Sequence, residues 1–156
     1  MRKFVVAKMG GFTEQQVDRI LELVRAWTET QPRIRAVALV GSWARGQARA
    51  NSDLDLMFLT SNPELFLHNA SWHHCLLWQE IGLEISDYYD LTYGVVWSRH
   101  LCFNSRQEIE FSFGALNWAD TKPIDLGTYR VASSGLKIIY DPDRLLANLM
   151  TTMKRS

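Results

Sequence analysis

The stretch GSWARGQARANSDLDL, residues 41–56, decides the fold of this chain. It follows an unbroken apolar run at residues 36–40, which is typical of a short strand buried on both faces. It ends inside a second predicted strand at about residues 54–60. The connection between the two strands is too short for a full crossover helix, so we expect one helical turn followed by a compact loop.

Asp53 and Asp55 stand two positions apart at the second of these strands. Alternate residues of a strand face the same side, so the two carboxylates project together while Leu54 and Leu56 face the other way. Like charges this close repel each other, and hard divalent cations with oxygen ligands are their natural neutraliser. Because an Asp-x-Asp pair often arises by chance, the apolar strand and the preceding glycine turn give this one its weight. The pattern predicts a site for Mg²⁺ or Mn²⁺.

Gly41 and Ser42 form the turn that leaves the first strand. A glycine at the end of a buried strand lets a ligand approach the backbone, and the next helical turn points free N–H groups and a serine hydroxyl outward. This is the outline of a phosphate-binding turn, to which Arg45 and Arg49 can add positive charge. No lysine follows the glycines, so the turn is not a P-loop.

Residues 107–113 alternate between polar and apolar side chains and predict a further strand. Glu108 and Glu110 share one face of it, opposite Ile109 and Phe111. We select Glu110 as the third acidic residue of the site because it lies deeper in the strand, and strands about 4.8 Å apart would bring it to the metal. Glu108 remains the alternative, and a solvent-facing glutamate without a function is the simpler explanation of either residue.

Together these residues resemble the signature of the polymerase beta-like nucleotidyltransferase superfamily, in which a Gly-Ser turn precedes an Asp-x-Asp strand and a third acidic residue lies on a further strand. Arg45-Gly46 and Ser52 are similar to the small bacterial members, among them the aminoglycoside nucleotidyltransferases and the minimal nucleotidyltransferase antitoxins. The resemblance implies an enzyme that binds a nucleoside triphosphate, with ATP as the expected donor, together with two Mg²⁺ ions. Such enzymes transfer the nucleotidyl group to a hydroxyl and release pyrophosphate.

The resemblance also implies a role for each candidate residue. The expected nucleotide-binding residues are Gly41, Ser42, Arg45 and Ser52. The expected metal ligands and catalytic residues are Asp53, Asp55 and Glu110. Glu110 is also expected to draw the proton from the attacking hydroxyl.

The remaining periodicity predicts one α+β domain over residues 1–156, with a mixed twisted sheet and helices mainly on one face, and the resemblance implies a nucleotidyltransferase-like fold for it. A capping box at Thr13 and Gln16 begins a helix at about residues 13–29. A helical segment at about 62–82, with a break at Ser71, follows the second strand. Further strands are predicted near residues 83–89, 94–103, 108–113 and 136–140, before a final short helix after Asp141-Pro142.

Composition bears on partners and location. The 17 basic and 17 acidic residues cancel, so the chain lacks the charge that binding of bulk nucleic acid or an anionic membrane requires. Cys75 and Cys102 are too few and too far apart for a disulfide framework or a zinc ribbon. Residues 1–7 hold too short an apolar run for a signal peptide or a membrane span. We therefore expect a cytoplasmic protein with reduced thiols.

The acceptor of the nucleotidyl group is left open by the sequence. Antibiotic-modifying relatives usually carry a further helical domain that shapes the acceptor pocket, whereas this chain ends soon after its last predicted strand. The acceptor site is then expected from the aromatic-rich middle of the chain, from a second copy, or from a helical partner protein. Two alternatives to the enzyme are an antitoxin-like module that caps or modifies a helical partner and a remnant that binds nucleotide without turnover.

Overall fold

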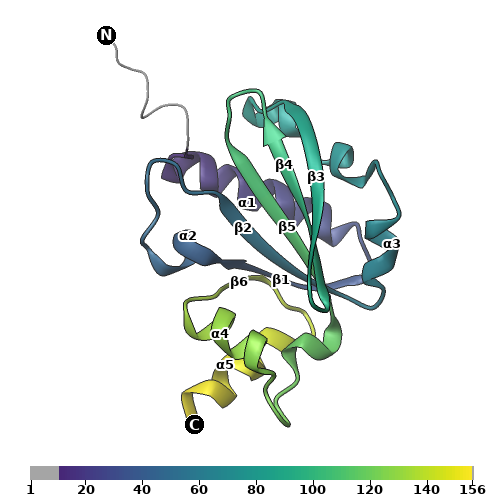
Figure 1. Cartoon of the computed structure of the whole chain (residues 1–156), viewed down its shortest axis with the longest axis vertical. Coiled ribbons are helices and arrows are strands. Elements are labelled where there is room, and N and C mark those ends of the chain that lie inside the picture. The colour runs from purple at the N-terminus through teal and green to yellow at the C-terminus, as the bar shows by residue number, and fades with distance from the viewer. Residues whose placement is uncertain (1–10, 156) are drawn as a thin grey trace.

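The computed structural model describes residues 11–155, so the N-terminal segment 1–7 considered above lies outside the described residues. Within that range, six strands form one mixed sheet in the order β3-β4-β5-β2-β1-β6 (Figure 1). The strands are β1 (Ile34–Val40), β2 (Leu54–Thr60), β3 (Ile85–Tyr93), β4 (Val96–Phe103), β5 (Glu108–Ala115) and β6 (Lys137–Tyr140). β2 and β5 run parallel, and the other neighbouring pairs are antiparallel. The α+β class and the mixed sheet are confirmed.

The predicted first helix and its capping box are also confirmed. The Thr13 hydroxyl accepts a hydrogen bond from the Gln16 N–H at 3.1 Å, and the Gln16 side chain accepts one from the Thr13 N–H at 2.9 Å. The helices are α1 (Glu14–Glu29), α2 (Gly41–Arg45), α3 (Pro63–Leu67), α4 (Leu126–Ser133) and α5 (Leu145–Arg155), with short 3-10 helices η2 (Trp72–Cys75), η3 (Trp78–Ile81) and η4 (Leu116–Ala119).

Alternation along β2 divides its side chains between two cores. Leu56 and Phe58 belong to the larger core, which α1 and the aromatic residues of 66–78 cover. Met57 and Leu59 face the opposite side and pack in a smaller core with residues of α4 and α5. The expected helical layer on one face is therefore joined by α4 and α5 at one end of the other face (Figure 1). Asp55 lies on this second face, beyond the part that the helices cover.

The helical segment expected at residues 62–82, with a break at Ser71, is wrong in its extent, because the chain there forms only the short helices α3, η2 and η3. The indole N–H of Trp72 donates to the carbonyl of Phe66 at 3.0 Å, and that of Trp78 donates to the carbonyl of His73 at 2.8 Å. The Arg99 guanidinium donates a hydrogen bond to the carbonyl of Asn69 at 2.8 Å. Buried side chains thus bind carbonyls that a continuous helix would use for its own hydrogen bonds.

Arg99 on β4 links this irregular segment to the sheet through hydrogen bonds. Its side chain is 2% exposed, and its Nε and Nη2 donate to the two carboxylate oxygens of Asp90 on β3 at 2.8 and 3.0 Å. The rings of Trp72 and Tyr88 lie 5.2 and 4.8 Å from the guanidinium carbon. A buried charge of this kind is tolerated only with its partner in place.

We therefore expect Asp90→Ala to destabilise the fold by about 3 kcal/mol, because it leaves the Arg99 charge buried and unpaired. The matched control is Asp143→Ala, which breaks the ion pair of Asp143 with Arg35, an equally short pair at 2.8 Å whose side chains are 47% and 32% exposed. That change should cost much less, because solvent screens an exposed ion pair. Urea unfolding of both variants checks the expectation, and equal losses would contradict it.

Candidate active site

The parallel pairing of β2 and β5 brings two of the predicted acidic residues face to face. Asp55 and Glu110 are direct Cα partners in this pairing, and their carboxyl groups lie close enough for Glu110 to raise the pKa of Asp55. Asp53 lies just before β2 begins, on the same side by alternation. The sequence pattern had placed these residues on separate strands, and the register decides that they meet.

Burial and mutual repulsion dominate the electrostatics of this acidic group. Burial raises the pKa of Asp55 to about 8, with the charge of Glu110 as the next cause and the hydrogen bond to Glu110 after it. Burial also raises the pKa of Asp53, and the Glu108 charge raises it further while His100 lowers it. Asp55 and Glu110 can hydrogen bond to each other only when one of them holds a proton. The group as described therefore carries less negative charge than its composition suggests.

This raised pKa makes the stability of the metal-free protein depend on pH. The folded protein keeps the Asp55 proton up to about pH 8, whereas the unfolded chain releases it near the ordinary value of 3.8. Between these values the folded state binds more protons, so the free energy of unfolding falls as the pH rises. For this one group the relation gives a loss of about 3 to 4 kcal/mol between pH 5 and pH 8. Urea unfolding in a chelator should show it.

Two variants test whether Asp55 causes this pH dependence of stability. Asp55→Asn should flatten this pH dependence, because the amide has no proton to lose in this range. Asp120→Asn changes an exposed residue outside the group and should keep the wild-type slope. A slope that survives in Asp55→Asn would assign it to other groups and contradict the expectation.

Gly41 is required by the close approach of the Asp55 carboxylate. Its φ angle is +75°, in the left-handed region that residues with a side chain rarely adopt. A Cβ atom at this position would overlap the Asp55 Oδ2 atom and meet its Cγ at 3.1 Å. The glycine predicted to admit a ligand therefore also admits the side chain of the facing strand. α2 begins at this glycine, and its C-cap residue is Gly46, whose φ is +71°.

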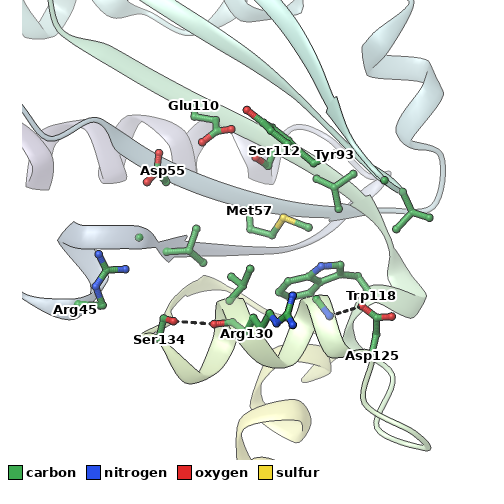
Figure 2. A pocket seen from close by; sticks show the side chains of 17 residues that line it. Arg45, Asp55, Met57, Tyr93, Glu110, Ser112, Trp118, Asp125, Arg130 and Ser134 are labelled. Carbon is green, nitrogen blue, oxygen red and sulfur yellow. Dashed lines mark hydrogen bonds between the residues drawn. The ribbon is translucent and has the colours of Figure 1, made fainter.

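A cavity of about 650 Å³ opens in front of this group. Figure 2 shows Asp55 and Glu110 on the sheet at one side of it and Arg130 and Trp118 at the other. The turn between β3 and β4 closes a third side with Gly94 and apolar neighbours. The lining residues are Val40, Gly41, Arg45, Asp55, Met57, Tyr93, Gly94, Val95, Val96, Glu110, Ser112, Trp118, Asp125, Gly127, Arg130, Val131 and Ser134.

The predicted residues divide into two groups by their place at this cavity. Four of them line it: Gly41, Arg45, Asp55 and Glu110. Asp53 is close enough to raise the pKa of Asp55, but it is not part of the lining. Ser42 lies in α2 outside the lining. The Ser52 hydroxyl accepts a hydrogen bond from the Arg49 N–H at 2.7 Å, so it shapes the loop before β2.

Sequence reasoning missed two groups of residues around the acids. His100 on β4 lies between Glu108 and Glu110, and alternation along β4 was the signal that could have placed it on their face. Trp118 and Arg130 come from the segment between β5 and β6. α4 in this segment exposes Leu126, Tyr129 and Val131, so it lacks the apolar stripe that would have predicted a helix.

Among residues 11–155, no three or more histidine, cysteine, aspartate and glutamate side chains are arranged as a ready metal-binding set. Within the same residues, no helix combines the length and the apolar character that crossing a membrane requires.

The mixed sheet, with a Gly-Ser turn ahead of an Asp-x-Asp strand and an acidic residue on the parallel neighbour, defines the class as a nucleotidyltransferase. The family model for streptomycin adenylyltransferase matches residues 14–151. Because this match spans most of the chain, the chain belongs to the streptomycin adenylyltransferase family. No curated protein sequence matches the chain significantly.

Solved structures of nucleotidyltransferases are similar to the chain. An aminoglycoside 6-adenyltransferase from Bacillus subtilis has 16% sequence identity and a TM-score of 0.46, over 71% of this chain and 38% of its own. The Cid1 poly(U) polymerase bound to MgATP has 17% identity and a TM-score of 0.46, over 71% of this chain and 33% of its own. The chain thus spans between 33% and 38% of the length of these two proteins.

Proposed function

We propose that this protein transfers a nucleoside monophosphate, AMP from ATP, to a hydroxyl group of a small molecule or protein and releases pyrophosphate. Membership of an adenylyltransferase family supports the reaction class. The observation that carries the proposal is the pairing of Asp55 with Glu110 beside Gly41, at the mouth of a cavity of about 650 Å³. Sites for small ligands usually have volumes of about 300–1,000 Å³.

The donor set suits a divalent cation, for which Mg²⁺ or Mn²⁺ is our proposal. Asp53, Asp55 and Glu110 offer carboxylate oxygens, which hard cations prefer. The raised pKa of Asp55 supports the fit, because the crowded acids hold a proton where a cation would offset their charge. When bound, such a cation supplies positive charge that stabilises the negative charge developing on the phosphates.

The residues of the chain would divide the remaining work between binding and proton transfer. Gly41 and Ser42 are proposed to bind the triphosphate through the start of α2, with Arg45 adding a positive charge at the cavity wall. Ser52 keeps the loop before β2 in place. The Glu110 carboxylate would accept the proton of the attacking hydroxyl, and holding both substrates in line supplies much of the rate.

The nucleoside is proposed to enter between the sheet and α4. Met57, Val96 and Trp118 make this part of the cavity apolar, and the indole ring offers a surface for a flat base. Stacking accepts any base, so the choice of ATP rests on the family rather than on these side chains. We also propose a cytoplasmic location, where ATP is present and the free thiols of Cys75 and Cys102 stay reduced.

The test combines pyrophosphate release with calorimetry. Each nucleoside triphosphate is titrated with and without Mg²⁺, and pyrophosphate is then measured with aminoglycosides, small alcohols or cell lysate as acceptor. Binding with acceptor-dependent pyrophosphate release is the expected result. Binding without release under every condition would favour the nucleotide-binding remnant, and no binding would favour a module that acts only through a protein partner.

A further inference from the structure

His100 lies at the centre of a chain of contacts that runs from Glu110 through His100 to Glu108 and Tyr89. It lies on β4 directly opposite Glu110 of β5 in the antiparallel pairing. The residue is 7% exposed, and it lies outside the cavity lining, of which Glu110 is part. A polar ring buried on this face needs partners for both of its nitrogens.

Both partners are glutamates of the neighbouring strand. The Nδ1 atom of His100 lies 2.8 Å from the Glu108 Oε2 atom, and its Nε2 atom lies 3.2 Å from the Glu110 Oε2 atom. The ring therefore links the two carboxylates that the sequence left as alternatives. Ser98, two residues earlier on the same strand, has its hydroxyl 3.3 Å from the same Nε2 atom.

Glu108 is outside the cavity lining and is held by two further side chains. The Tyr89 hydroxyl donates to the Glu108 Oε2 atom at 3.1 Å, and the Cys102 thiol donates to its Oε1 atom at 3.7 Å. The Tyr89 ring also stacks on the His100 ring, with centroids 4.6 Å apart and planes 7° from parallel. Glu108 is thus occupied by three side chains, whereas Glu110 reaches the cavity and contacts Asp55.

We propose that His100 is a positioning residue, which holds the Glu110 carboxylate toward Asp55 while Glu108 and Tyr89 hold the ring. A glutamate at an open cavity loses side-chain entropy when it is confined to one rotamer, so a fixed contact on its far oxygen lowers that cost during catalysis. This inference rests on the proposed function, because it makes Glu110 the working carboxylate and Glu108 its support.

Two substitutions of His100 separate the two ends of the ring. In His100→Gln the side-chain amide reaches the position of Nε2 and can donate to Glu110. In His100→Asn the shorter amide reaches the position of Nδ1 and keeps only the contact with Glu108. We expect kcat to fall about 10-fold to 100-fold in His100→Asn, with the KM for nucleotide nearly unchanged, and to stay within a few-fold of wild type in His100→Gln. Equal losses, or the reverse order, would overturn the proposal.

Affinity for Mn²⁺ alone gives a readout that does not need turnover. Measured by the relaxation of water protons, it should weaken about 10-fold in His100→Asn and remain near wild type in His100→Gln. If the wild type binds Mn²⁺ with this order of variants but releases no pyrophosphate, the positioning role holds and the proposed function fails. If the wild type is active and the variants are alike in both measurements, the positioning role alone fails.

A third variant covers the case in which neither His100 variant folds, as judged by thermal unfolding. Tyr89→Phe removes one hydroxyl from a residue that is 43% exposed and keeps the ring that stacks on His100. We expect it to fold and to lower kcat about three-fold through the loosened Glu108. If kcat and the Mn²⁺ affinity of this variant are both unchanged, the inference that this chain of contacts positions Glu110 is wrong.

Discussion

Asp55→Asn is expected to lower the rate of nucleotidyl transfer by about a hundredfold to a thousandfold while the domain stays folded. The change removes one negative charge from the paired acids and leaves Glu110 opposite an amide that cannot replace a carboxylate as a ligand for a hard cation. The fold should tolerate it, because a neutral side chain removes both the cost of burying a charge and the repulsion from Glu110, the two main causes of the raised pKa of Asp55. Steady-state pyrophosphate release at saturating nucleotide and Mg²⁺ measures the effect.

Two further variants accompany this experiment. Asp53→Asn should also abolish metal-dependent transfer, since Asp53 is the other proposed ligand from the Asp-x-Asp pair. Asp120→Asn is the control, because this aspartate is exposed and lies outside the cavity lining. Undiminished turnover in both Asp53→Asn and Asp55→Asn would refute the assignment of the site.

Gly41→Ala should lower the activity about a hundredfold, nearly as much as Asp55→Asn. The cause is a displacement of the site rather than a change of its charge. Its Cβ atom would overlap the Asp55 carboxylate, so either the start of α2 or the aspartate must move. A displacement of about 1 Å at a reacting group can cost this much in rate. The positive φ of +75° adds strain to the same substitution. Activity and the free energy of unfolding should be measured together.

Gly46→Ala is the matched control for that strain. Gly46 has a φ of +71°, close to that of Gly41, but a Cβ atom there would meet nothing within 4 Å. It should lose about 1 kcal/mol of stability from the left-handed backbone and keep most of its activity. If the two alanine variants lose activity equally, backbone strain in α2 rather than contact with Asp55 is the cause.

The local features of the fold were readable from the sequence. The capping box at Thr13 predicted the start of α1, and the apolar runs predicted β1 and β2 to within a few residues at their ends. The helical segment after β2 was predicted with a break at Ser71, but the structure forms only short helices there. The hydrophobic pattern of this segment does not indicate that Arg99, some 30 residues later, donates a hydrogen bond to the carbonyl of Asn69. Propensity was overridden there by tertiary contacts.

Much of the candidate site could also be predicted from local patterns in the sequence. Asp53 and Asp55 share a face because of the two-residue period of a strand, and Gly41 stands out as the residue that ends an apolar run. The place of Ser42 and Ser52 outside the cavity lining could not be read from spacing. Nor could the contacts of Glu108, which depend on β3 and β4 lying beside β5.

What the sequence determined by itself was therefore the type of α1, of the strands and of the final helix, together with the residues of the Gly-Ser and Asp-x-Asp motifs, because periodicity, capping and turn chemistry act within a few residues. Only the tertiary structure decided that Asp55 faces Glu110, that His100 lies behind them, and that α4 closes the cavity from the other side. These arrangements arise from strand register and helix packing between segments far apart in the chain, and no local pattern specifies such contacts.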